Sequence, residues 1–189
     1  MSITMFKEAV SNNDGLKAAL ALQDISDISA PKNVLVKNTL LVYATGHFAT
    51  QVVSLLLSLK ADPNVKGVGG YTSLHLARDK DTVRLLLEAG ANIDSKDNED
   101  STPLQYAVHS GNVEIVEMLI RAGANVNTQN SHGWTPLHNS INKGYADVVR
   151  VLLNAGADKT IAAQGGLTAY SLAVANIDPV IIGMLQETE

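Results

Sequence analysis

The chain has 189 residues, 46% of them hydrophobic, which suits one folded domain or one short array of repeats. It contains no cysteine, so disulfides, thiolate catalysis and cysteine-based zinc sites are excluded. A net charge of −5 without any run of Lys or Arg argues against a nucleic-acid partner, because phosphate binding requires clustered cations.

The apolar stretches are too short for a membrane span. The most apolar one, residues 52–59, is far shorter than the roughly 20 residues that a spanning helix needs. The N-terminal stretch 1–10 includes Lys7 and Glu8 and contains no apolar signal core. We therefore expect a cytoplasmic protein that does not associate with membranes.

The stretch 1–32 predicts two short helices and an irregular connection. Residues 5–11 and 16–22 are the two helical stretches, and residues 12–15 between them are Asn, Asp and Gly, which favour a turn. Residues 26–32 predict an irregular connection because Pro31 would interrupt a helix that ran through them.

One segment recurs from about residue 35 onward. Its opening is Thr-Pro-Leu followed by Gln or His in two copies and Thr-Ser-Leu-His in another. Five copies open at Thr39, Thr72, Thr102, Thr135 and Thr168, and the differences between successive numbers are 33, 30, 33 and 33. Within each copy the apolar residues fall at helical spacing, so each copy predicts a pair of helices.

This period and this opening resemble those of the ankyrin-repeat family. The resemblance implies an all-α ankyrin-repeat solenoid of about six helix-turn-helix units with hairpin-like loops, whose apolar faces are buried only when neighbours stack. The expected parts of one continuous domain are 1–32 (degenerate N-terminal capping unit), 33–66 (repeat), 67–96 (shortened repeat), 97–129 and 130–162 (repeats) and 163–189 (C-terminal capping repeat).

The repeats depart from the family pattern in several places, among them Leu40 where proline is usual and Phe48 where Gly111 stands. The shortened repeat lacks three residues between its helices, which predicts a truncated first helix and places Asp81 as the N-cap of a helix over 82–88. Lys60 aligns with Gly123, which we expect in a left-handed conformation, so we expect strain or a re-routed chain at Lys60. Asp100 replaces the glycine of the loop turn and tolerates positive φ.

His75 and His138 are candidates for catalysis or metal binding. Both occupy the fourth position of the recurring opening, where the resemblance implies a structural histidine that hydrogen-bonds the backbone of the adjoining loop. Gln105 stands at the same position of another copy, which argues against a shared metal site. We favour the structural role for both histidines.

Acidic residues gather on the loop that contains Asp97, Glu99 and Asp100. They could form a weak divalent-ion site, but the spacing of a calcium loop is missing and a solvated acidic loop is the better interpretation. No motif for a nucleophile, a phosphate-binding loop or a zinc site is present. We therefore expect no enzymatic activity, no cofactor and no metal.

The residue before each opening threonine is a candidate partner contact, because the family places it on the side of the loop that faces the concave groove. Trp134, the sole tryptophan of the chain, holds this position and lies outside the stacking rows. It is either a binding anchor or a support for the neighbouring loop, and the sequence leaves both open.

The family's other contact positions lie at the loop tips and at the ends of the first helices. The complete set of predicted partner-binding residues is Tyr71, Asn98, Glu99, Ser101, Tyr106, His109, Ser110, Ser131, His132, Trp134, Asn139, Asn142 and Lys143. These side chains are polar or aromatic and carry no excess of one charge, which suits a protein or peptide rather than a polyanion.

We therefore expect a monomeric, non-catalytic protein–protein interaction module that binds a protein partner through its concave loop-and-helix surface. Two narrower alternatives stay open. The chain could be a dedicated inhibitor or regulatory companion of one enzyme, or a bacterial effector that acts in a host cell, although we recognise no export signal in the sequence.

Overall fold

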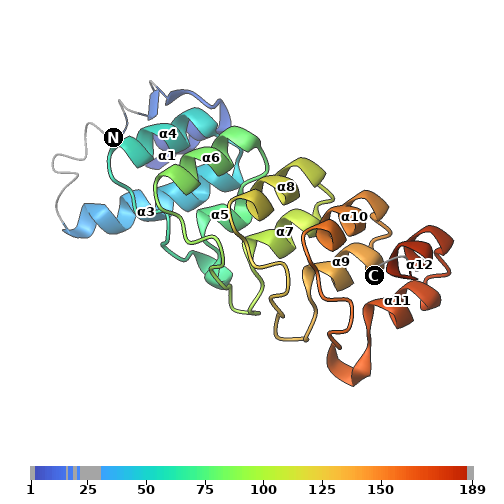
Figure 1. Cartoon of the computed structure of the whole chain (residues 1–189). Coiled ribbons are helices and arrows are strands. Elements are labelled where there is room, and N and C mark those ends of the chain that lie inside the picture. Colours follow the sequence, from blue (N-terminus) through green and yellow to red (C-terminus); the bar gives the residue numbers. More distant parts are fainter. Residues whose placement is uncertain (1–2, 16, 19–20, 22–30, 187–189) are drawn as a thin grey trace. The chain divides into compact units, whose positions relative to one another are not determined.

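A computed structural model describes residues 3–15, 17–18, 21 and 31–186 (Figure 1). Within these residues the regular elements are helices and short 3-10 turns, with one isolated bridge between Ala162 and Thr168, which confirms the all-α prediction. The chain divides into an N-terminal unit, Met1–Asn92, and a C-terminal unit, Ile93–Glu189. In the described part no helix is both long and apolar enough to cross a membrane.

The N-terminal unit is a stack of helices around a small aliphatic core. Its described helices are α1 (Ile3–Ser11), α3 (Pro31–Gly46), α4 (Thr50–Ser58), α5 (Ser73–Leu76) and α6 (Lys80–Glu88), with a 3-10 turn at Val68–Gly70. Helix α4 packs against α3 and α6, and α5 packs against α3. Leu41, Leu56 and Leu86 are completely buried in this core.

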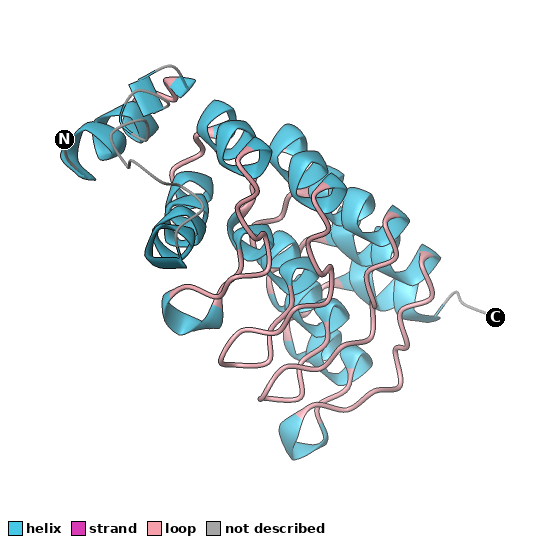
Figure 2. Cartoon of the chain, turned by 90° about the vertical axis from the view of Figure 1, so that its left-hand side faces the viewer, coloured by secondary structure: helices cyan, strands magenta, loops and turns pink. Residues whose placement is uncertain are grey.

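The C-terminal unit contains three consecutive helix pairs. They are α7 (Pro103–His109) with α8 (Val113–Arg121), α9 (Pro136–Asn142) with α10 (Ala146–Asn154), and α11 (Ala169–Ala175) with α12 (Pro179–Gln186). The first helices of the pairs form one row and the second helices another (Figure 1), since α9 packs between α7 and α11, and α10 between α8 and α12. The loops that join successive pairs extend away from the helices (Figure 2).

The recurring threonine explains where each first helix begins. Thr102, Thr135 and Thr168 are extended N-cap residues, and the side chain three residues later accepts from the backbone N–H of each. The hydroxyls of Thr135 and Thr168 also accept from the N–H of that later residue, whereas the buried Thr102 hydroxyl has no hydrogen-bond partner among the described residues. Pro103 and Pro136 occupy the first helical position, where the missing N–H costs no hydrogen bond. One short sequence signal thus starts a helix in the same way in each copy.

Polar side chains join neighbouring repeats where the loops begin. In the N-terminal unit the Asn64 side-chain oxygen accepts from the Asn92 backbone N–H at 2.7 Å, and its amide donates to the Gly90 carbonyl at 3.0 Å. In the C-terminal unit the Asn127 side-chain oxygen accepts from the Asp158 N–H at 2.8 Å. These bonds fix the register of each repeat against the next.

The shortened repeat confirms one expectation and corrects another. Helix α5 has four residues where α9 has seven, so the truncation is confirmed. The predicted N-cap Asp81 is wrong: α6 begins at Lys80, and the carboxylate of Asp79 accepts from the Thr82 N–H at 2.8 Å. Asp81 lies in the first turn and forms an ion pair with Arg84 at 3.0 Å.

Pro31 also behaves differently from the prediction. It is the first residue of the sixteen-residue helix α3, so it starts a helix instead of interrupting one. The turn expected at residues 12–15 is present, with Asn13 at φ +49°. Most of the helix expected over 16–22 and most of the connection expected over 26–32 lie outside the described residues.

Candidate functional site

The loop tips of the C-terminal unit are shaped by two equivalent side chains, one in each of two successive repeats. The carboxylate of Asp97 accepts from the backbone N–H groups of Glu99 and Ser101, both at 2.8 Å. The side-chain oxygen of Asn130 accepts from the N–H groups of His132 and Trp134, at 3.0 and 2.9 Å. Each loop therefore folds around a short polar side chain that imitates a backbone turn.

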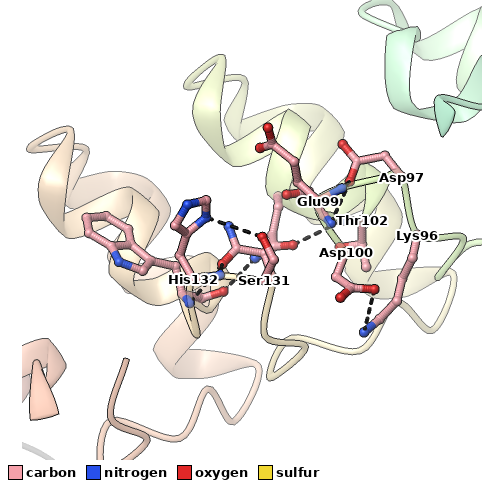
Figure 3. Close-up of polar contacts among 11 residues, drawn as sticks. Lys96, Asp97, Glu99, Asp100, Thr102, Ser131 and His132 are labelled. Atoms are coloured by element: carbon pink, nitrogen blue, oxygen red, sulfur yellow. Dashed lines mark hydrogen bonds and ion pairs between the residues drawn. The ribbon is translucent and has the colours of Figure 1, made fainter. Parts of the chain in front are cut away.

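Successive loop tips are also hydrogen-bonded to one another. The Ser131 N–H donates to the Glu99 carbonyl at 2.8 Å, and Figure 3 shows these two tips side by side. The Gln164 N–H donates to the His132 carbonyl at 3.2 Å, and its side-chain amide donates to the Ser131 carbonyl at 3.0 Å. The tips therefore form a continuous backbone-bonded edge.

The turn itself requires a residue that accepts positive φ. Asp100 has φ +59°, as expected from its polar side chain, and Gly133 has φ +75°. A Cβ on Gly133 would lie 3.1 Å from the Cα of Ala163, so the next loop leaves no room for a side chain there. The loops consequently approach each other closely at this point.

The residue at the fourth position of the recurring opening, Gln105 or His138, hydrogen-bonds the loop of the next repeat. The Gln105 side-chain amide donates to the Trp134 carbonyl at 2.7 Å, and His138 Nε2 lies 3.0 Å from the Leu167 carbonyl. His138 Nδ1 accepts from the backbone N–H of Thr135, so Nε2 carries the proton and donates to Leu167. The structural role predicted for His138 is confirmed.

Burial sets the electrostatics of His138. The side chain is fully buried, and desolvation lowers its pKa below the ordinary value, although the hydrogen bond to Leu167 opposes the shift. The imidazole is therefore neutral near pH 7, and its two nitrogens are occupied by backbone contacts of adjoining repeats. Such a histidine has no free nitrogen for catalysis or for a metal.

The acidic loop does not assemble a metal site. Both carboxylate oxygens of Asp97 are engaged, because its second oxygen accepts from the Tyr106 hydroxyl at 2.9 Å. Asp100 pairs with Lys96 at 3.7 Å on the exposed side of the loop (Figure 3). Among the described residues no group of three His, Cys, Asp or Glu side chains is arranged to hold a metal ion.

Trp134 has features of both roles that the sequence left open. It is partly exposed, and its ring centre lies 6.1 Å from that of His138 with the planes tilted by 46°. Its backbone is fixed at both polar atoms, since the N–H donates to Asn130 and the carbonyl accepts from Gln105. The indole thus rests on the buried opening motif and leaves part of its surface to solvent.

The other predicted contact residues of the C-terminal unit fall into two groups. The loop-tip residues Asn98, Glu99, Ser131 and His132 are exposed, and so are His109, Ser110, Asn142 and Lys143 at the ends of α7 and α9. Tyr106 and Asn139 are partly exposed. Together with Trp134 these residues form what we call the candidate surface.

Ser101 does not fit this set. It is buried, and its N–H and carbonyl are both used by Asp97 within the loop. Its backbone shapes the turn, and its side chain offers a partner almost no surface. The sequence signal that selected it, the position before the opening threonine, specifies a place on the loop but not the exposure of a small side chain there.

Tyr71 lies in the N-terminal unit and is considered separately. It is partly exposed, with its ring centre 6.2 Å from that of His75. A Cβ on Gly69 would lie 2.6 Å from the Tyr71 ring, so the ring covers the adjacent glycine turn. These contacts favour a supporting role for Tyr71 within its own loop.

Two exposed apolar residues of the N-terminal unit escaped the sequence prediction. Val68 is almost fully exposed at a loop tip, at the position that Asn98 holds in the next repeat. Phe48 is more than half exposed at the position of Gly111. The repeat alignment carried the signal in both cases, because an apolar residue replaces a polar or glycine residue at a surface position.

The described part of the C-terminal unit includes the following two open grooves. One, of about 690 Å³, lies between α10 and α12 and includes Arg150, Leu153 and Met184. The other, of about 310 Å³, includes Tyr145 and Asp147. The lining of each contains a single charged side chain, so neither groove brings together the acid and base that general acid–base catalysis requires.

Comparison with known proteins agrees with this architecture. Residues 6–97 and 78–163 match the family model described as ankyrin repeats (3 copies). The protein fem-1 homolog A of Danio rerio is 38% identical over 37% of this chain and 13% of its own length. The poly [ADP-ribose] polymerase tankyrase of Caenorhabditis elegans is 30% identical over 48% of this chain and 5% of its own length. The chain thus spans a small part of either relative.

Proposed function

Since the chain belongs to the ankyrin-repeat family, a non-catalytic fold for protein–protein interaction, we propose that it is an interaction module whose C-terminal unit binds a protein partner through the candidate surface. The proposal concerns binding alone and assigns the chain no catalytic activity. What the two relatives do as whole proteins adds nothing to it, because the similarity covers only a small part of each.

The observation that carries the proposal is the prior ordering of the loops. Asp97 and Asn130 fold each tip, the Ser131–Glu99 bond joins the tips, and Gln105 holds the backbone of Trp134. A surface that is already ordered loses little conformational entropy when it binds. The exposed side chains therefore need no refolding to contact a partner.

The chemistry of the candidate surface supports a protein partner. Glu99 and Lys143 give it both charge signs, and Asn98, Ser131 and Asn142 can both donate and accept hydrogen bonds. Trp134 adds an aromatic surface of the kind that is enriched at binding hot spots. A polyanion would need an excess of cations, which this surface lacks.

The test is affinity purification with mass spectrometry, comparing wild type with Trp134→Ala. If Trp134 is an anchor, capture of the partner falls at least about tenfold, the loss expected for roughly 1.4 kcal/mol. Tyr71→Ala is the matched control, because it removes an aromatic ring at the same repeat position in the N-terminal unit and should leave capture nearly unchanged.

Circular dichroism of both variants must show intact helices for the comparison to count. Equal capture by wild type and a folded Trp134→Ala variant would remove Trp134 from the site. The captured protein would also decide between the narrower roles: one enzyme inhibited at a one-to-one ratio indicates a dedicated inhibitor, and a protein of another organism indicates an effector.

A further inference from the structure

The groove of about 690 Å³ between α10 and α12 differs in charge from the same place one repeat earlier. At the equivalent positions of α8 and α10 the sequence has four charged residues, Glu117, Arg121, Asp147 and Arg150. The lining of the groove between α10 and α12 has one, Arg150, and otherwise includes the apolar residues Leu153, Pro179, Val180 and Met184. This groove therefore combines an aliphatic surface with a single cation.

Gly183 keeps the groove open at a cost to its own helix. It lies inside α12, at the position where the preceding second helices have Arg84, Glu117 and Arg150. Glycine inside a helix is less stable than alanine, because it loses more conformational entropy on folding. A Cβ on Gly183 would have no described atom within 4 Å, so packing against the neighbouring helices does not require a glycine here. What the missing side chain provides is space in the groove.

Arg150 is available to a ligand in this groove. In α6, Asp81 and Arg84 stand three residues apart and form an ion pair at 3.0 Å. Asp147 and Arg150 repeat this arrangement in α10, yet the Arg150 side chain has no hydrogen bond or ion pair with any described residue. It lines the groove with α12, and Asp147 lines the other groove. Its guanidinium can therefore bind a carboxylate through two parallel hydrogen bonds.

A further repeat stacked on α12 would not cover this groove. The equivalents on α10 of the lining residues of α12 are Ala146, Asp147, Arg150 and Val151. They are exposed or partly exposed, although α12 packs against α10. The lining positions thus belong to the outer surface of a repeat even where the next repeat is present, and an occupant of the groove has to approach from outside the row of second helices.

We propose that the groove between α10 and α12 binds an amphipathic helix of a protein partner, whose aliphatic side chains cover Val180 and Met184 and whose acidic side chain pairs with Arg150. Two neighbouring helices form a groove that suits a third helix, and such helices bind through apolar residues at positions i, i+4 and i+7. A free fatty acid suits the groove less well, because ligand pockets enclose most of a small molecule and no residue lining this groove is buried. The groove shares no residue with the candidate surface, so this proposal goes beyond the function proposed above and can fail without it.

The test uses a fluorescein-labelled, alanine-based helical peptide with Leu at positions i, i+4 and i+7 and Glu at i+3, so that all four share one face. Fluorescence anisotropy measures its binding to the full chain, beside a peptide with Gln in place of Glu. We expect the Glu peptide to bind about three- to fivefold tighter, the effect of a partly exposed ion pair. Arg150→Gln should abolish this difference and leave binding of the Gln peptide unchanged. Arg121→Gln, which alters an exposed arginine of α8 outside the groove, is the matched control and should keep the difference.

Gly183→Gln separates binding from stability. The variant should unfold at a higher temperature than wild type, because a side chain at this position favours the helix. It should nevertheless bind both peptides at least about tenfold more weakly, since the new side chain occupies the groove.

Three results would overturn the proposal: no binding of the Glu peptide at about 200 µM protein, equal binding of the Glu and Gln peptides, or a Gly183→Gln variant that binds as wild type does. Sodium decanoate tests the small-molecule alternative. If it displaces the labelled peptide at a lower concentration than the unlabelled peptide does, the ligand is a small aliphatic carboxylate and the proposal of a partner helix is wrong.

Discussion

Lys60 in the N-terminal unit and Gly123 in the C-terminal unit occupy the same corner of the repeat, directly after the second helix. Lys60 has φ +62° and Gly123 has φ +97°, and each N–H donates to the carbonyl three residues earlier at 2.9 Å. The corner is thus nearly the same whichever residue occupies it. The repeat imposes the backbone conformation, and a residue other than glycine has to bear the strain.

The shortened repeat keeps the contact that caps its first helix, although that helix is shorter. Helix α5 has lost almost half the length of α9, yet Thr72 and His75 keep the capping contact of Thr135 and His138, with the threonine hydroxyl 2.8 Å from Nδ1 in both. The junction of loop and first helix is therefore retained where helix length is not. The two units should respond differently to changes in the core and alike at the junction.

The largest effect is expected from Leu152→Ala, compared with Leu86→Ala. Both leucines are completely buried at the same position of the second helix, one in each unit. Removing a buried leucine side chain costs about 2–5 kcal/mol, and less where the surroundings can close the cavity. We expect Leu152→Ala to cost about 1 kcal/mol more than Leu86→Ala, because the short α5 leaves the neighbours of Leu86 freer to move.

Urea unfolding followed by circular dichroism at 222 nm measures both costs. Leu153→Ala, which alters the partly exposed neighbour of Leu152, should cost less than about 1 kcal/mol and serves as the control. Equal losses of unfolding free energy for the two buried leucines would show that helix length does not affect how the core relaxes. The expected difference between the cores of the two units would then be wrong.

His138→Gln tests the junction, with a smaller expected effect. Gln105 shows that glutamine can fill this slot and still donate to the next loop. We therefore expect the free energy of unfolding to fall by only about 1 kcal/mol near pH 7, because glutamine replaces the histidine hydrogen bond imperfectly. The more specific result concerns pH, because burial lowers the pKa of His138 in the folded state.

The direction of the pH effect follows from proton uptake. Below about pH 6.5 the unfolded chain binds a proton at His138 that the folded chain resists, so acidification destabilises the fold from that pH down to the lowered pKa. Stability measured from pH 7.5 to 5 should fall less steeply for His138→Gln than for wild type. The control is His132→Gln, which alters an exposed histidine and should leave the change of stability with pH as it is in wild type. Equal effects of the two variants would contradict the assignment of this pH dependence to His138.

The repeat pattern predicted much of this molecule for a physical reason. A residue such as Thr135 acts through contacts three positions away, and local contacts of this kind are visible in sequence. The period itself then places His138 against the next loop, which is a long-range contact made predictable by repetition. The positive φ at Asp100 followed from the same alignment.

The errors arose where one position could be satisfied in two ways. Asp79 and Asp81 lie two residues apart at the start of α6, the second helix of the shortened repeat, and only the packed structure selects Asp79 as the cap. Ser101 shares a repeat position with Trp134, but a small side chain is buried where a large one extends into solvent. Exposure depends on the size of a residue and on its neighbours, which the repeat period does not encode.

The smallest effect is expected from exchanging the corner residues, Lys60→Gly and Gly123→Lys. Left-handed backbone costs a residue with a side chain about 1–2 kcal/mol, and glycine loses about 0.5–1 kcal/mol more conformational entropy on folding. We therefore expect the free energy of unfolding to rise by about 0.5–1 kcal/mol for Lys60→Gly and to fall by a similar amount for Gly123→Lys. A Cβ at Gly123 would have no atom within 4 Å, so the loss would be conformational and not steric.

Thermal unfolding of the two variants should show shifts of opposite sign, and the shifts should nearly cancel in the variant that combines both changes. Two shifts of the same sign would mean that the corners differ in packing, and that the repeat does not impose one conformation on both units.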